Sequence, residues 1–237
     1  MAGSKLTRLL RNPFGLMLRA VRKKIIGPLK YGKGAGYDVE RYWRDRFSKH
    51  GLSLRGAGNE GLSENQNRQL YEEAGRTFTD LCRAEGIEFA KASVLEIGVG
   101  TGFYTGLLRQ AGVKQYLGLD ITDVLFDKLR GQVPGFRFAQ KDITAETPEG
   151  KFDLVVMMDV VEHIVEETHL EAAMANVRQV LAPGGVFVIS GVHDRSKRTL
   201  FYVRCWSAEE IARHFPGCVV TGPIPFRDNN VLVFRQP

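Results

Sequence analysis

The stretch from residue 94 to residue 102, VLEIGVGTG, constrains the fold more than any other part of the chain. Its first residues predict a short buried strand, and Gly98, Gly100 and Gly102 predict a turn that a ligand can approach closely. The apolar helix predicted directly after the turn would present free backbone N–H groups to that ligand. We expect the carboxylate of Glu96 to face the same space.

Predicted strands and helices alternate from residue 93 onward. We expect strands over 94–97, 115–119, 136–140, 152–158, 186–190, 218–221 and 231–234, and helices over 123–131, 168–181 and 207–215. The early strands are apolar nearly throughout, which is typical of a parallel sheet that is covered on both faces. The pattern predicts an α/β, Rossmann-like, mostly parallel sheet with helices on both faces.

We divide the chain into a basic amphipathic arm (1–33), a helical lid (34–90) and a core (91–237). The arm holds an amphipathic helix over 13–26, which Gly27-Pro28 should end. It could bind an anionic membrane surface, pack on its own body or a partner subunit, or be a transit peptide. Lid helices are predicted over 39–49 and, from a capping box, over 63–84.

The charge distribution argues against a nucleic-acid-binding surface on the body of the protein. Nine of the 33 Lys and Arg residues lie in the arm, which has no acidic residue. The rest of the chain therefore contains 24 basic and 27 acidic residues, so the body is slightly acidic. Nucleic acid is thus an unlikely partner. The odd number of cysteines, three without C-x-x-C spacing, indicates a reducing compartment, and we expect a cytoplasmic protein.

Acidic residues recur where the predicted strands end, at the edge where ligands bind in open α/β sheets. Asp120 follows the second strand and suits the two hydroxyls of a ribose. A nicotinamide dinucleotide would also fit Asp120, but its G-x-G-x-x-G fingerprint needs glycine at position 103, where this chain has Phe103. The pattern here is E-x-G-x-G-x-G.

The ordered set of motifs resembles class I S-adenosylmethionine-dependent methyltransferases over residues 90–237, and within them the small-molecule enzymes of the ubiquinone-biosynthesis type. The matching segments are EIGVGTG (96–102), Asp120, KDI (141–143), FD (152–153), DVVEH (159–163) and LAPGG (181–185). The resemblance implies S-adenosylmethionine as cofactor. It also implies seven strands in the sheet, with the last one antiparallel.

The resemblance implies a role for each matching residue. The three glycines would admit the methionine part of the cofactor, Glu96 and Asp159 would lie near it, and Asp120 would bind the ribose. Asp142 and the Ile143 N–H would contact the adenine, and Ile121 lies next to Asp120 in the same site. From their position alone, Tyr42 and Trp43 of the lid could cover the cofactor, and a role in the hydrophobic core is the alternative. The candidate cofactor-binding residues are therefore Tyr42, Trp43, Glu96, Gly98, Gly100, Gly102, Asp120, Ile121, Asp142, Ile143 and Asp159.

Methyl transfer to a hydroxyl needs a general base, and His163 is our candidate because histidine titrates near neutrality. His193 is a second candidate, and a helix-capping or loop-fixing role for His163 stays open. We interpret His50, His169 and His214 as surface or structural residues. Asp159, Glu162 and His163 could instead hold a divalent cation, but no fourth ligand is evident and we assign no metal.

The acceptor is constrained mainly by absent motifs. Neither the Asn/Asp-Pro-Pro-Tyr segment of adenine methylation nor a Pro-Cys nucleophile is present, so we favour a hydroxyl oxygen of a small molecule, lipid or saccharide. A methyltransferase of RNA or protein and a non-catalytic S-adenosylmethionine-binding partner protein are the alternatives. A basic cluster could receive an anionic acceptor or form a solvated loop: Arg195, Lys197, Arg198 and Arg204. The sequence does not fix the oligomeric state.

Overall fold

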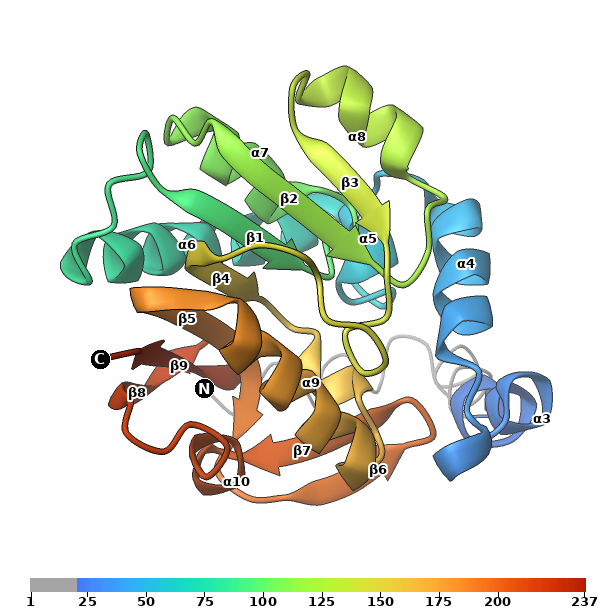
Figure 1. Cartoon of the computed structure of the whole chain (residues 1–237). Coiled ribbons are helices and arrows are strands. Elements are labelled where there is room, and N and C mark those ends of the chain that lie inside the picture. The colour runs from blue at the N-terminus through green and yellow to red at the C-terminus, as the bar shows by residue number, and fades with distance from the viewer. Residues whose placement is uncertain (1–20) are drawn as a thin grey trace.

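The computed structural model describes residues 21–237 and contains one twisted sheet between two helical layers (Figure 1). The strands are β1 (Ser93–Ile97), β2 (Gln115–Asp120), β3 (Arg137–Gln140), β4 (Phe152–Met157), β5 (Leu181–His193), β6 (Lys197–Leu200), β7 (Val203–Ser207), β8 (Val219–Phe226) and β9 (Asn229–Arg235). The helices are α3 (Gly27–Tyr31), α4 (Val39–His50), α5 (Leu54–Ala57), α6 (Glu64–Ala84), α7 (Phe103–Gln110), α8 (Phe126–Gln132), α9 (Glu167–Val180) and α10 (Ala208–Ala212).

The strand order confirms the predicted fold class. β3, β2, β1, β4 and β5 pair in parallel and in that spatial order. β9 then pairs antiparallel with β5, and β8 pairs antiparallel with β9 at the edge. The expected seven strands and the antiparallel last strand are present along this path. Two additional strands, β6 and β7, raise the total in the described part of the chain to nine.

Successive side chains on the central strands point to opposite faces of the sheet and pack into two separate hydrophobic clusters, one on each face. Val94 joins the cluster that includes the helices α4 to α8, whereas Leu95 and Ile97 join the cluster that includes α9 and α10. Val156 and Met157 of β4 divide between the two faces in the same way. The near-continuous apolar strands of the sequence therefore reflect burial on both faces.

The hairpin β6–β7 was not predicted from the sequence. β7 pairs in parallel with the last two residues of β5, where Val192 faces Trp206, and β9 occupies the other edge of β5 at the same point. β4 and β7 thus pair with the same edge of β5, one after the other: β4 ends at Met157, and β7 pairs with the residues of β5 beyond that point. The hairpin was missed because β6, with the sequence KRTL, is short, largely exposed and charged, and has no apolar alternation.

The N-terminal part begins with helical structure at the end of the sheet where the parallel strands finish (Figure 1). Of the predicted helix 13–26, residues 13–20 lie outside the described residues. The expectation that Gly27-Pro28 ends a helix was wrong: a π-helical turn (Arg22–Ile26) runs into α3, which holds Pro28 in its first turn and ends at Tyr31, just before Gly32. Pro28 thus lies at the junction of the π-helical turn and α3.

The lid helices confirm the predicted boundaries closely. Asp38 caps α4, and the capping box of Ser63 and Gln66 begins α6. The short helix α5 lies in the glycine-dotted segment between them and was not predicted. Phe78 of α6 packs in the same buried cluster as Val94 of β1. The division into arm, lid and core stays a prediction. Among the described residues, we find no helix with the length and apolar character needed to cross a membrane.

Candidate active site

The glycine turn between β1 and α7 forms the floor of a cavity of about 170 Å³. Gly98, Gly100 and Gly102 have φ angles of 78°, 50° and 80°, in the left-handed region that glycine tolerates. A Cβ atom on Gly98 would lie 2.2 Å from Cγ2 of Val160. Gly98 and Gly100 line the cavity, whereas Gly102 lies behind it as the residue before α7. The turn therefore needs glycine both for its backbone and for its packing.

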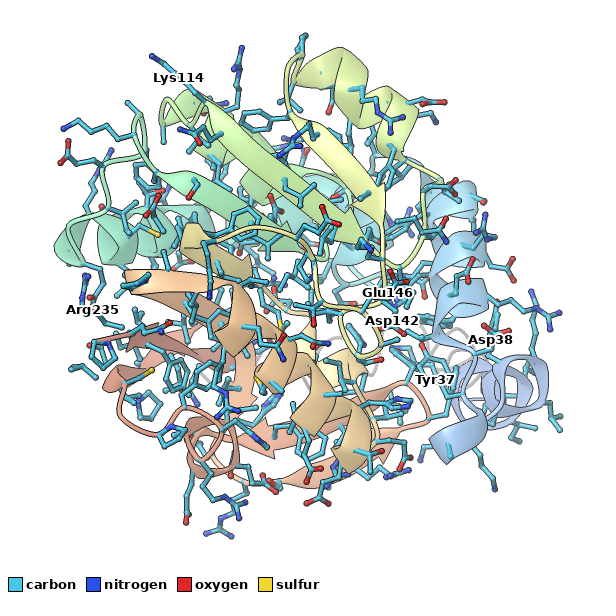
Figure 2. The ribbon with its side chains drawn as sticks, viewed as in Figure 1. Tyr37, Asp38, Lys114, Asp142, Glu146 and Arg235 are labelled. Carbon is cyan, nitrogen blue, oxygen red and sulfur yellow. The ribbon has the colours of Figure 1, made fainter. Side chains whose placement is uncertain are left out.

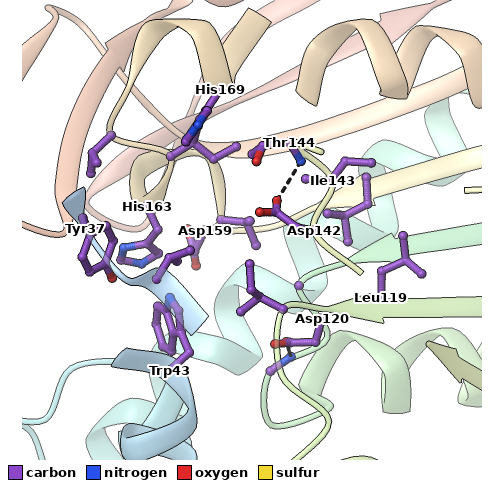
Figure 3. A pocket seen from close by; sticks show the side chains of 18 of the residues that line it. Tyr37, Trp43, Leu119, Asp120, Asp142, Ile143, Thr144, Asp159, His163 and His169 are labelled. Carbon is purple, nitrogen blue, oxygen red and sulfur yellow. Dashed lines mark hydrogen bonds between the residues drawn. The ribbon is translucent and has the colours of Figure 1, made fainter. Parts of the chain in front are cut away.

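Asp120 faces the cavity at the end of β2 and is fixed by the neighbouring backbone (Figure 3). Its Oδ2 atom accepts a hydrogen bond from the Gly100 N–H at 2.9 Å, and its Oδ1 atom accepts one from the Thr122 N–H at 3.2 Å. Burial raises the Asp120 pKa to about 6, although these backbone donors oppose the rise. The carboxylate is thus ionised near neutrality and held in one orientation.

Asp142 lies beyond Asp120 along the same wall (Figure 3), and its Oδ1 atom accepts a hydrogen bond from the Thr144 N–H at 2.8 Å. Ile121 and Ile143 also line the cavity. Two carboxylates with apolar residues beside them can bind the hydroxyls and the exocyclic amine of a nucleoside whose base packs on the aliphatic side chains.

The structure does not bring Glu96 to the cavity, so the expectation that it faces the ligand space was wrong. Its Oε2 atom accepts hydrogen bonds from the hydroxyls of Thr105 at 2.9 Å and Tyr116 at 2.7 Å, inside the core. Alternation along β1 explains this, because Glu96 shares the face of Val94 beneath the helices. Burial raises the Glu96 pKa to about 7 despite the two donors.

Asp159 follows β4 at the centre of the site and lines the cavity (Figure 3). Its φ angle of 56° is unusual for a residue other than glycine. Its Oδ1 atom accepts hydrogen bonds from Ser190 Oγ at 3.0 Å and Asn229 Nδ2 at 3.1 Å, and its Oδ2 atom contacts the guanidinium of Arg227. Burial raises the Asp159 pKa, and Arg227 opposes that rise. Arg227 was not anticipated from the sequence.

His163 lines the cavity near Asp159 and Trp43 (Figure 3). Its Nδ1 atom lies 2.9 Å from the carbonyl oxygen of Tyr202, which can only accept, so Nδ1 carries the proton when the ring is neutral. Burial lowers the His163 pKa, although Glu162 opposes this. A neutral ring with its basic Nε2 atom available follows from these contacts.

His193 does not line the cavity, in contrast to His163. Its Nε2 atom lies 3.5 Å from Oε2 of Glu162, while Nε2 of His163 lies 3.7 Å from Oε1 of the same carboxylate. The contact with Glu162 raises the His193 pKa. Burial opposes ionisation of Glu162, but the two histidines hold its pKa below the ordinary value. Glu162 therefore connects the two candidate bases.

The two lid aromatics that we singled out lie in different places. Trp43 lines the cavity and its ring centroid lies 4.9 Å from that of His163. Tyr42 does not line the cavity; it stacks on Tyr202 at 4.8 Å and accepts a hydrogen bond from Arg46. The sequence missed Tyr37, which lines the cavity with a buried hydroxyl that has no partner within residues 21–237. A polar ligand group would satisfy that hydroxyl.

His169, interpreted as surface or structural, is exposed and also lines the cavity near Thr144 (Figure 3). Arg198 of β6 pairs with Glu166 at 3.0 Å, and Arg204 of β7 lies 3.6 Å from Glu167. Internal ion pairs thus occupy two of the four basic residues considered for an anionic acceptor. Within the described range, no group of three or more His, Cys, Asp or Glu side chains has the arrangement of a metal site.

Comparisons with known proteins agree with this geometry. A family model described as a methyltransferase domain matches residues 95–189. A ubiquinone biosynthesis O-methyltransferase of Aromatoleum aromaticum is 30% identical over 52% of this chain and 53% of that protein. The chain thus spans about half the length of such relatives, and 5% or less of the polyketide and peptide synthases that also match.

Two solved structures share the fold. Magnesium protoporphyrin IX methyltransferase (ChlM) of Synechocystis PCC 6803, with bound S-adenosylmethionine, has a TM-score of 0.65 and 17% identity, over 86% of this chain and all of that one (100%). The N-methyltransferase NodS of Bradyrhizobium japonicum WM9, with S-adenosylhomocysteine, has a TM-score of 0.57 and 22% identity, over 70% of this chain and 87% of that one. A methyltransferase domain therefore matches residues 95–189, and the glycine turn, Asp120 and Asp142 surround a cavity in a fold that this chain shares with S-adenosylmethionine-dependent methyltransferases.

Proposed function

We propose that the protein methylates a hydroxyl oxygen of a small-molecule acceptor, with His163 as the general base. The observation that carries this proposal is the contact between His163 Nδ1 and the Tyr202 carbonyl, because it directs the proton to Nδ1 and leaves Nε2 basic. A buried, neutral imidazole in the cavity wall suits proton removal from a hydroxyl. An amine acceptor would need this help less, since a neutral amine is a stronger nucleophile than a neutral hydroxyl.

S-adenosylmethionine supplies an electrophilic methyl group on a sulfonium. Asp120 would hold the ribose, Asp142 the adenine, and the turn at Gly98 and Gly100 would admit the methionine part. The acceptor oxygen would attack the methyl carbon in line with the breaking carbon–sulfur bond, whose electrons go to sulfur. His163 would take the hydroxyl proton on Nε2, and the lid would exclude water and orient the acceptor.

The lid side of the cavity supports an aromatic or apolar acceptor in preference to a saccharide. It carries Tyr37, Val39, Trp43 and Phe47, and the last two are themselves nearly buried. Such walls gain by removing apolar surface from water and offer few partners for the many hydroxyls of a sugar. We therefore place a hydroxylated aromatic compound or lipid head first among acceptor classes.

The test pairs hydroxylated benzenes with anilines of the same ring and follows transfer of a tritiated methyl group. We expect label on the phenols, and His163→Gln should lower turnover by about 10²–10⁴-fold while S-adenosylhomocysteine affinity changes little. His193→Gln is the matched control, because His193 contacts the same Glu162 but lies outside the cavity wall. Label on the anilines alone, or a loss below tenfold in His163→Gln, would contradict the proposal.

We also propose that the arm binds an anionic membrane surface through its apolar side. In the described part of the arm, Val21, Ile25, Ile26 and Leu29 are exposed by 39%, 55%, 52% and 83%. Tyr31 attaches this helix to the body through a hydrogen bond to Asp45 at 2.9 Å. The described helix therefore leaves its apolar side chains in solvent, which weakens the alternative that they pack on the body.

Charge complements this apolar side. Lys23 and Lys24 are exposed on the same helix, and residues 1–33 contain no acid that would repel anionic lipid. The helix leads within a few residues to Gly34, which lines the cavity. A membrane-bound acceptor head would thus meet the cavity close to the lipid surface.

Sedimentation with phosphatidylcholine vesicles, with and without phosphatidylserine, tests the attachment. The protein should sediment with the anionic vesicles, and Ile25→Asp with Leu29→Asp should abolish this without changing S-adenosylhomocysteine affinity. Val219→Asp with Val220→Asp is the matched control, since this exposed pair lies on the edge strand β8, on the opposite side of the molecule from α3 (Figure 1). Failure of the unaltered protein to sediment with anionic vesicles would reject the proposal.

A further inference from the structure

The buried pair of Arg227 and Asp159 connects the last β-hairpin to the methionine end of the cavity. Arg227 lies in the turn between β8 and β9 with a φ angle of 56°, and its side chain is 12% exposed. Its guanidinium lies over the ring of Tyr71 at 4.6 Å. Tyr71 and Asp159 both line the cavity, so Arg227 meets the cavity wall at two of its members.

Hydrogen-bond donors beside this pair are left unused. Nε of Arg227 and the hydroxyl of Tyr104 are buried without a partner anywhere in the part of the chain that the structure describes. Tyr104 is only 6% exposed, and the charges of Asp159 and Arg227 act on its pKa, which burial raises. Buried donors without partners are costly, so an acceptor is expected here. Arg227 and Tyr104 do not line the cavity themselves, and a ligand would reach them beside Tyr71 and Asp159, which do.

The charges of the pair match those of an amino acid. Asp159 is negative and Arg227 positive, and the methionine part of S-adenosylmethionine carries one α-ammonium and one α-carboxylate. We propose that Arg227 binds the α-carboxylate of the cofactor, with Tyr104 as a second donor, while Asp159 accepts from the α-ammonium. A guanidinium offers the paired N–H groups that carboxylates bind best. The inference depends on the cofactor and not on the identity of the acceptor.

Calorimetry with two ligands tests this assignment without any methyl acceptor. S-adenosylhomocysteine carries the carboxylate, and its decarboxylated analogue does not. The unaltered protein should prefer S-adenosylhomocysteine. Arg227→Met should lower that affinity by about 10–100-fold and change affinity for the decarboxylated analogue less than threefold. Tyr104→Phe should show the same selectivity with a smaller loss.

Arg235→Met is the matched control. Arg235 lies on β9 of the same hairpin, pairs with Glu85 at 2.8 Å, and is on the side of the molecule away from Asp142 (Figure 2). Its replacement should therefore lower the affinities for both ligands equally and only slightly. Equal losses for both ligands in Arg227→Met would make Arg227 a support for Asp159 and overturn the proposal. Equal affinity of the unaltered protein for the two ligands would also overturn it, and this second measurement does not require a variant to fold.

Discussion

Glu96→Gln separates a structural role of this residue from a role in ligand binding. Raising the Glu96 pKa from 4.5 to about 7 corresponds to about 3 kcal/mol of unfolding free energy at roughly 1.4 kcal/mol per pKa unit. The folded protein holds this proton more tightly than the unfolded chain does. The stabilisation is therefore complete below the ordinary pKa and is lost as the pH rises through about 7.

The glutamine variant has no such titration, and its amide oxygen can still accept from Thr105 and Tyr116. Guanidinium chloride unfolding at several pH values should therefore show the unaltered protein losing stability relative to Glu96→Gln by up to about 3 kcal/mol as the pH rises. Other titrating groups cancel in this difference. Glu72→Gln, an exposed position on α6, serves as the control and should leave the unfolding free energy unchanged.

Two outcomes would refute this reasoning. Parallel pH profiles of the unaltered protein and Glu96→Gln would mean that burial does not raise the pKa of this carboxyl. The contacts of Glu96 with Thr105 and Tyr116 place it in the core. A loss of tenfold or more in the affinity of Glu96→Gln for S-adenosylhomocysteine would mean that Glu96 contacts the ligand after all.

Two other predictions concern the floor of the cavity. Asp120→Ala should lower S-adenosylhomocysteine affinity by about 100-fold or more in calorimetry, because two ribose hydroxyls lose their acceptor. Since burial raises the Asp120 pKa to about 6, affinity of the unaltered protein should also fall as the pH drops below that value, and a flat profile from pH 5 to 8 would contradict this. Gly98→Ala should destabilise the fold by about 1–3 kcal/mol, because its Cβ would lie 2.2 Å from Val160 and its φ angle is positive. Gly106→Ala is the control for thermal unfolding: nothing lies within 4 Å of its added Cβ on α7, and a gain of about 0.5–1 kcal/mol is expected there.

The features that the sequence predicted well are those carried by local patterns. The capping box at Ser63 set the start of α6, and the apolar run at 94–97 identified β1. Asp120 and Asp142 could be placed at the cavity because the carboxyl ends of parallel strands share one edge of the sheet. Each of these inferences needs only a few consecutive residues and a general rule about sheets.

The features that were missed depend on contacts between distant segments. Arg227 reaches Asp159 across 68 positions of the sequence, from a turn whose residues carry no distinctive pattern. Glu96 was misplaced because we assumed that a residue near the end of a strand points its side chain into the ligand space. The alternation of side chains along β1 instead points the Glu96 side chain toward α7. Tyr37 was overlooked because nothing in its neighbourhood distinguishes a cavity-lining tyrosine from a surface one.

The β6–β7 hairpin connects the candidate base to the aromatic residues of the N-terminal part. Its tip carries Phe201 and Tyr202: the Tyr202 carbonyl fixes the His163 ring, and Phe201 stacks on Tyr31 of the arm at 6.2 Å. The cofactor motifs lie on the sheet and the turn after β1, so they can stay constant while this hairpin and the lid change. Acceptor specificity in this chain should therefore follow from the aromatic contacts between hairpin and lid, and not from the motif residues that bind the cofactor.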